Sequence, residues 1–157
     1  MDIPSENRWL SRETINLNLT AESELETIEA MLELVDKSGL TADIKILAED
    51  LLHHEVLEPT HTGNCALIFH VLSRSVIKPG IFFGRFVKGI GYYSESGHPI
   101  DLVFLIVAPP EMEADFLNVM GKIKSAMGKP DARKELREAK TPEAALKILG
   151  DVTKLNG

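Results

Sequence analysis

The sequence predicts an α/β fold, a three-layer sandwich in which helices cover both faces of a mixed central sheet of about four to five strands. Three observations favour this fold. Short apolar runs typical of strands stand among longer stretches with helical spacing. The run 101–108 is apolar at every position after its first residue, as expected of a strand buried on both faces. The connection between the predicted strands 65–72 and 81–87 is too short for a parallel crossover, which makes the sheet mixed.

The chain opens with an arm and a short strand. We expect residues 1–11 to form a loose arm that Trp9 and Leu10 dock onto the body of the protein. Apolar residues then alternate with asparagines over residues 15–19. This alternation is the period of a strand with one buried face.

Two helices follow this strand. Ser23 stands three residues before Glu26, the spacing of a capping box, and Gly39 is a natural stop for the first helix. Thr41 is expected to cap the second helix. The apolar residues expected on one face of this second helix are Ile44, Leu47, Leu51 and Leu52.

Three further strands occupy the middle of the chain. The run 65–72 is almost continuously apolar and predicts a strand buried on both faces. A proline–glycine turn leads to the predicted strand 81–87. Pro109 ends the strand 101–108, because proline cannot donate to a ladder of hydrogen bonds.

The last third of the sequence has helical spacing. Pro130 allows a new helix to start, and Leu136 is expected to face inward from it. Thr141 is a helix cap that is followed by proline at the first helical position. The apolar stripe of the first helix in this region is expected to hold Phe116, Leu117, Met120, Ile123 and Met127.

Composition limits what the protein can do. The 157 residues are 44% apolar and 26% charged, which is typical of a single globular domain over residues 1–157. Acidic residues outnumber basic ones 24 to 17, and a net charge of -7 argues against a nucleic-acid partner. The single cysteine, Cys65, excludes an internal disulfide and a cysteine-based zinc site. The sequence lacks a secretory signal pattern and a long apolar run, so we expect a cytoplasmic protein without membrane insertion.

All five histidines lie between residues 53 and 98, and one of them, His70, interrupts an apolar strand. Three interpretations are open for it. His70 can be a core histidine whose ring nitrogens are satisfied by backbone groups. It can be a nucleophile with a fixed tautomer. It can also be a metal ligand together with His53, His54 and His61, although the adjacent His53 and His54 point about 100° apart on a helix.

The segment before the apolar strand offers possible anion donors. Gly63 and Asn64 precede the strand, where successive backbone N–H groups can face an anion, although a plain turn has the same composition. Arg74 adds positive charge shortly after His70. Standard nucleophile-elbow, phosphate-loop and dinucleotide signatures are missing.

The segment 60–70 resembles the active-site segment of enzyme IIA of the fructose/mannitol class, a component of the bacterial phosphoenolpyruvate-dependent sugar phosphotransferase system with a nitrogen-related regulatory branch. The family pattern is Ser-Thr-Gly-Ile-Gly-Asn-Gly-hydrophobic-Ala-hydrophobic-Pro-His. Thr60, Gly63, Asn64 and His70 match it in register. The resemblance extends over most of the chain, which implies one enzyme IIA-like domain.

The resemblance implies a phosphoryl carrier without a metal or a cofactor. His70 would accept the phosphoryl group from a small phosphohistidine carrier protein. It would pass the group to a IIB component of a sugar permease or use it to signal to a regulatory target. The candidates for the phosphate pocket are His54, Thr60, Gly63 and Asn64, at positions that correspond to the family pattern, and Arg74, which adds positive charge after His70.

Several positions depart from the family pattern. Phe69 replaces the proline before the phosphorylated histidine, and Val71 replaces a small residue after it. His54 stands where the family has an arginine, and Phe116 stands where it has a second histidine. These departures remove a permanent cation and a hydrogen-bond donor from the pocket. They leave an alternative open, a divergent regulatory domain that binds a partner protein without carrying phosphate.

Overall fold

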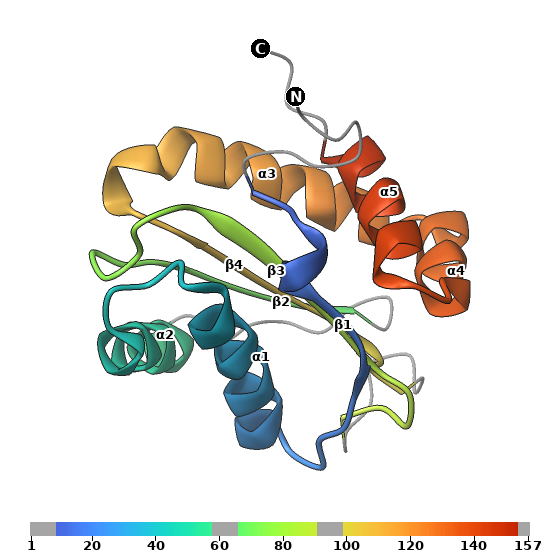
Figure 1. Ribbon diagram of the computed structural model, residues 1–157, viewed down its shortest axis with the longest axis horizontal. Helices are drawn as coiled ribbons and strands as arrows, with labels where there is room; N and C mark the ends of the chain where they lie inside the picture. Colours follow the sequence, from blue (N-terminus) through green and yellow to red (C-terminus); the bar gives the residue numbers. More distant parts are fainter. Residues whose placement is uncertain (1–8, 58–65, 91–98, 154–157) are drawn as a thin grey trace.

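The computed structural model describes residues 9–57, 66–90 and 99–153, and the predicted order of elements is confirmed (Figure 1). One strand is followed by two helices, three strands and three helices, with two short 3-10 turns. The elements are η1 (Arg12–Thr14), β1 (Ile15–Leu19), α1 (Glu24–Ser38), α2 (Ile44–Leu57), β2 (Ala66–Leu72), β3 (Gly80–Phe86), β4 (Leu102–Ala108), η2 (Pro110–Met112), α3 (Glu113–Met127), α4 (Pro130–Glu138) and α5 (Pro142–Val152).

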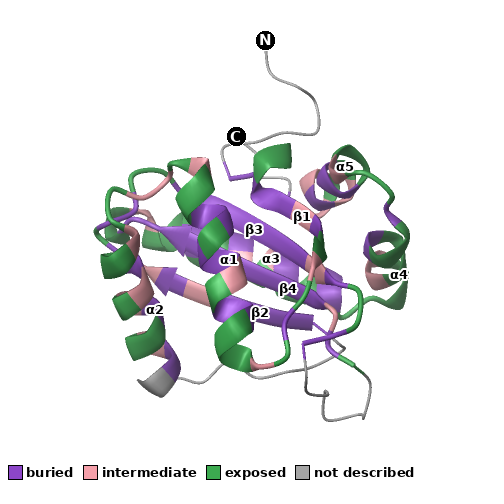
Figure 2. Cartoon of the chain, turned by 60° about the horizontal axis from the view of Figure 1, so that its bottom comes forward, coloured by how far each residue is buried: buried purple, intermediate pink, exposed green. Residues whose placement is uncertain are grey.

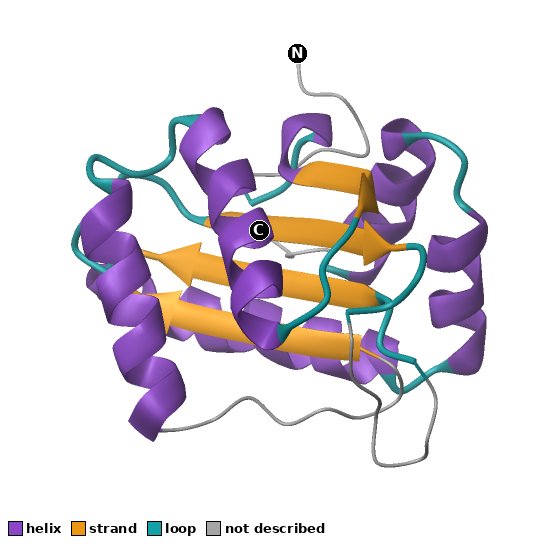
Figure 3. Cartoon of the chain, turned by 90° about the horizontal axis from the view of Figure 1, so that it is seen from below, coloured by secondary structure: helices purple, strands orange, loops and turns teal. Residues whose placement is uncertain are grey.

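The strands form one four-stranded mixed sheet in the order β1-β3-β4-β2. β1 runs parallel to β3 and β2 runs parallel to β4, whereas β3 and β4 are antiparallel, as the arrows in Figure 3 show. β2 and β3 therefore run in opposite directions, as the short connection required, but β4 lies between them. This order leaves β2 at an edge of the sheet.

Helices cover both faces of the sheet, which confirms the predicted three-layer sandwich. α1 and α2 lie on one face, and α3, α4 and α5 lie on the other (Figure 1). Each face has its own apolar cluster, and all seven residues of β4 are buried between the two clusters. Figure 2 shows the strands largely buried beneath α1 and α2.

The ends of α1 confirm the predicted local signals. The Ser23 hydroxyl accepts a hydrogen bond from the Glu26 backbone N–H at 3.1 Å. The Glu26 carboxylate accepts from the Glu22 backbone N–H, so the capping box is only half formed. Gly39 ends α1 with φ 75°, a left-handed conformation that glycine adopts without steric cost.

The predicted cap of α2 is wrong. The Asp43 carboxylate accepts hydrogen bonds from the backbone N–H groups of Lys45 and Ile46 at 2.9 and 3.4 Å, which is the role of an N-cap. The Thr41 hydroxyl instead donates to the Ser75 carbonyl at 3.0 Å. Thr41 therefore joins the start of α2 to the turn after β2.

Some predicted buried positions are exposed. Trp9 and Leu10 are 2% and 3% exposed, so the docking of the arm is confirmed for these two residues. Leu52 and Leu117, predicted to face the core, are 41% and 53% exposed. Val87 lies beyond the end of β3 and is 69% exposed. The two leucines lie on α2 and α3 outside the narrow stripe of each helix that contacts the sheet.

Candidate functional site

A cleft of about 820 Å³ lies at the edge of the sheet, where α2 and α3 flank the end of β2. The cleft is lined by apolar side chains of the two helices. Polar side chains of α2 and of the chain after β2 also line it. The cleft is lined by Ile46, Asp50, His53, His54, His70, Val71, Leu72, Ser73, Arg74, Pro110, Glu113, Phe116, Leu117 and Met120.

The pleat of β2 determines which side chains meet this cleft. Successive side chains of a strand point to opposite faces. Leu67 and Phe69 pack into the cluster beneath α1 and α2, and Ile68 packs into the cluster beneath α3. His70 shares the face of Ile68 and is partly buried. Phe69 departs from the family pattern and was expected at the phosphate pocket. It is 1% exposed in the cluster beneath α1 and α2 and does not line the cleft.

The His70 ring is held by its own strand. Its Nδ1 lies 3.2 Å from the carbonyl oxygen of Ile68. A carbonyl oxygen only accepts hydrogen bonds, so Nδ1 carries the proton of the neutral ring. The lone pair is then on Nε2. His70 therefore has the fixed tautomer that a nucleophilic imidazole requires.

Burial lowers the pKa of His70 below the ordinary histidine value of 6.5. The hydrogen bond to the Ile68 carbonyl acts in the opposite direction, because it favours the charged ring. The charges of His54 and Lys124 lower the pKa further, and the Glu55 carboxylate raises it. With its pKa below 6.5, the ring is neutral near pH 7 and its lone pair is on Nε2.

His70 lies between one polar and one apolar neighbour. The His54 ring, from α2, meets it edge to face, with centroids 4.9 Å apart and an interplanar angle of 70°. The Phe116 ring, from α3, is 6.2 Å from the His70 ring centroid at 53°. Phe116 is 4% exposed and forms an apolar wall of the cleft. The structure thus brings His54, His70 and Phe116 together as the resemblance implied.

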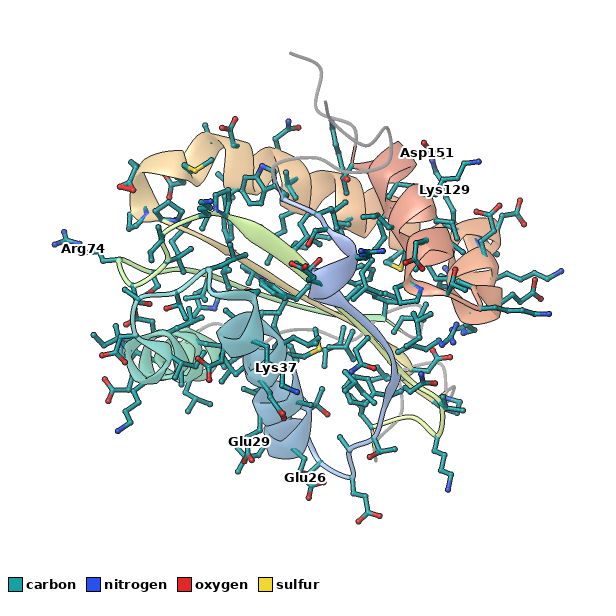
Figure 4. The ribbon with its side chains drawn as sticks, viewed as in Figure 1. Glu26, Glu29, Lys37, Arg74, Lys129 and Asp151 are labelled. Atoms are coloured by element: carbon teal, nitrogen blue, oxygen red, sulfur yellow. The ribbon has the colours of Figure 1, made fainter. Side chains whose placement is uncertain are left out.

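Other predicted pocket residues do not join this cluster. Arg74 lines the rim of the cleft, but its side chain is exposed and points away from the body of the protein (Figure 4). Thr60, Gly63 and Asn64, as well as His61, lie outside the described residues. Their place in the phosphate pocket stays a prediction.

Sequence reasoning missed three polar residues of the cleft, Asp50, Ser73 and Glu113. The Ser73 hydroxyl donates to the Asp50 carboxylate at 2.6 Å. Asp50 precedes His54 by four residues, and that spacing places both on one face of a helix. The four-residue spacing from His54 was the sequence signal for Asp50. No sequence signal marked Ser73, because serines are common in turns.

In the described part of the chain, no set of side chains supports the interpretation of His70 as a metal ligand. Residues 9–57, 66–90 and 99–153 contain no cluster of three or more histidine, cysteine, aspartate or glutamate side chains arranged to hold a metal ion. In the same ranges, no helix is both long and apolar enough to cross a membrane.

Residues 8–152 match the family described as phosphoenolpyruvate-dependent sugar phosphotransferase system, EIIA 2. The chain is 31% identical over 140 residues to the PTS system fructose-specific EIIABC component of Bacillus subtilis, with 89% of this chain covered. It spans only 22% of that longer relative. It is 32% identical to the nitrogen regulatory protein of Bradyrhizobium diazoefficiens, with 77% of this chain and 80% of the relative covered.

Solved structures share the fold. The complex of enzyme IIAMTL and phosphorylated enzyme IIBMTL from Escherichia coli contains a chain that superimposes with a TM-score of 0.74 at 21% identity, over 90% of this chain and 97% of that one. This likeness shows that the two chains share a fold. On the extent of the family match, the chain belongs to the EIIA 2 family of the phosphoenolpyruvate-dependent sugar phosphotransferase system.

Proposed function

We propose that this enzyme IIA domain is a phosphoryl carrier and that Nε2 of His70 accepts the phosphoryl group. One observation carries the proposal: His70 lines an open cleft with its Nδ1 bound to a backbone carbonyl. A histidine with a purely structural role would be sealed in the core, whereas this ring is only partly buried. Its lowered pKa supports the same role, because a neutral ring is the attacking species.

The transfer step balances without a further reactant. The Nε2 lone pair of His70 attacks the phosphorus of a donor phosphohistidine, and a new N–P bond forms. The N–P bond of the donor breaks, and its electron pair stays on the donor nitrogen. The donor ring, protonated on its other nitrogen, leaves as neutral imidazole. The His70 ring keeps its Nδ1 proton and becomes positively charged, and the Ile68 carbonyl then stabilises that charge.

Transferred phosphoryl groups need positive charge and hydrogen-bond donors around their equatorial oxygens. We infer that His54, whose ring is next to His70, supplies a donor on the α2 side. Thr60 and the backbone N–H groups of Gly63 and Asn64 are proposed as further donors, as the family pattern implies. Arg74, which is at the rim, would reach the group only after turning inward.

The proposed partners are proteins. A small phosphohistidine carrier is the proposed donor, and its basic contact face would complement the net charge of -7. A IIB component of a sugar permease is a proposed acceptor, in line with the Escherichia coli complex of a IIA enzyme with phosphorylated IIB. A cytoplasmic location follows from these partners as part of the proposal.

Labelling tests the proposal directly. The protein is incubated with a phosphorylated carrier protein, and the label is mapped by mass spectrometry. We expect an acid-labile label on His70 that is lost in His70→Ala, a variant checked for folding by circular dichroism. The absence of label on the wild-type protein would refute the function, and so would label that survives in His70→Ala.

A regulatory domain that does not carry phosphate is the second candidate. Two observations favour it: Phe116 puts an apolar wall beside His70, and a relative of similar length is a nitrogen regulatory protein. Such a domain would bind its target protein equally well before and after His70→Ala. Binding that changes with phosphorylation of His70 would contradict this candidate and support the carrier.

A further inference from the structure

A partly buried hydrogen bond joins the middle of α2 to the chain that leaves β2. The Ser73 hydroxyl donates to Asp50 Oδ2 at 2.6 Å, and Ser73 is 2% exposed. The Ser73 backbone N–H donates to the Ala108 carbonyl at 3.0 Å, which continues the pairing of β2 with β4 by one residue. Ser73 is therefore fixed to the sheet, and its hydroxyl ties α2 to that fixed point.

Each end of this hydrogen bond lies on the segment that carries one of the paired histidines. Asp50 lies one helical turn before His54 on α2. Ser73 lies three residues after His70, directly beyond β2. All four side chains line the same cleft. The hydrogen bond therefore bridges the two elements whose relative position sets the distance between the His54 and His70 rings.

The turn after β2 supports the Ser73 end of this bridge. The Ser75 hydroxyl lies 2.8 Å from the Ser73 hydroxyl, and the Ser75 backbone N–H donates to the Ser73 hydroxyl oxygen at 3.2 Å. The Ser75 carbonyl accepts from the Thr41 hydroxyl at 3.0 Å and from the Ala42 N–H at 2.7 Å. The turn is thus attached to the chain before α2 as well as to α2 itself.

Apolar packing alone would not fix α2 along the sheet edge. Leu47 and Leu51 are fully buried and hold the helix against the core. Apolar burial has no preferred direction, so it leaves small shifts and rotations of a helix inexpensive. A short hydrogen bond to a carboxylate has a narrow range of distances and angles. The Asp50–Ser73 bond supplies the directional restraint that apolar burial lacks.

We propose that Asp50 is a positioning residue that sets the His54–His70 geometry through Ser73. Its effect on transfer rests on the proposed phosphoryl-carrier function. Phosphoryl transfer depends mainly on positioning, and small misplacements of reacting groups cost large factors in rate. We expect loss of the Asp50 carboxylate to slow phosphoryl acceptance about tenfold.

Four variants separate this role from simple stabilisation. Asp50→Ala removes the acceptor, Asp50→Asn keeps an acceptor oxygen, and Ser73→Ala removes the donor. Glu49→Ala is the matched control, since it removes a carboxylate from an exposed neighbouring position on α2. Imidazole NMR signals of His54 and His70, assigned with single histidine variants, report the ring geometry directly. Thermal unfolding and the rate of phosphoryl acceptance are measured on the same samples.

We expect Asp50→Ala and Ser73→Ala to shift both sets of imidazole signals and slow acceptance, and Glu49→Ala to change neither. Asp50→Asn should restore much of the wild-type pattern. The double variant of Asp50 and Ser73 should behave like either single variant, because both act through one bond. Unchanged imidazole signals in folded Asp50→Ala would overturn the proposal. The signals decide this point even if the wild-type protein takes no label, a result that would refute only the carrier function.

Discussion

The imidazole rings of His54 and His70 meet edge to face with centroids 4.9 Å apart, although one comes from a helix and the other from a strand. The Phe116 ring faces His70 from a third element, 6.2 Å away. Among the described residues, His54 is the polar residue whose ring contacts the His70 ring. It occupies the position where the family pattern has an arginine.

Replacing His54 tests whether it assists transfer. We expect His54→Arg to raise the rate of phosphoryl acceptance about tenfold, because a guanidinium adds a permanent charge and a fork of donors for the phosphoryl oxygens. His54→Ala should lower that rate by a similar factor. Quenched-flow labelling with a phosphorylated carrier measures both. Equal rates for the wild type and both variants would show that His54 takes no part.

The lowered pKa of His70 predicts an unusual pH profile. Acceptance requires the neutral ring, so its rate should hold as the pH falls to 6.5 and decline only below that value. NMR titration of the His70 ring protons gives the midpoint independently. A midpoint at or above 6.5 would contradict the dominant effect of burial.

The same shift links His70 to stability. As the pH falls below 6.5, the ring of the unfolded chain takes up a proton before the ring of the folded protein does. The free energy of unfolding should therefore be highest above 6.5 and decrease as the pH falls from 6.5 to the folded-state pKa. Urea unfolding at several pH values measures this. His70→Gln should remove that part of the pH dependence, and an unchanged profile in this variant would exclude the link.

The fold was largely predictable because strands and helices differ in apolar period. The interior run 102–108 and the cap at Ser23 depend on local sequence, and both are confirmed. The strand order was not predictable, since nothing local places β4 between β2 and β3. Leu117 was misplaced because helical spacing defines a stripe but not how much of that stripe a neighbouring element covers.

The candidate site was predictable where one residue dominates and not where contacts are long-range. His70 stands out as a histidine within an apolar strand, and the structure places it in the cleft. Phe69 was expected near the pocket because the family pattern has proline there, but adjacent strand residues point to opposite faces, so Phe69 packs into the other core. The Asp50–Ser73 bond joins residues 23 positions apart, and no spacing rule covers such a pair.

Arg85 should be important for stability rather than for transfer. Its partly buried guanidinium donates hydrogen bonds that tie β3 to β1 and to the end of α4, at 2.6 to 3.2 Å. The acceptors are the carbonyl oxygens of Leu17, Leu136, Arg137 and Ala139. Arg85→Met should lower the free energy of unfolding by about 3 kcal/mol, because these carbonyls lose a charged donor. Arg74→Met, at an exposed arginine, is the control in urea unfolding, and equal losses would contradict the role of Arg85.

Phe116→His tests whether the phenylalanine stabilises the fold at the expense of phosphoryl acceptance by His70. Phe116 is 4% exposed, so a polar ring there should lower the free energy of unfolding by about 2–4 kcal/mol. The new ring nitrogen would also give the cleft a second donor beside His70, which should raise phosphoryl acceptance about tenfold. Phe116→Leu is the matched control, since it disturbs the packing without adding a donor. If both variants lose stability and neither gains rate, the apolar wall does not limit transfer, and Phe116 serves the packing of α3 against the sheet.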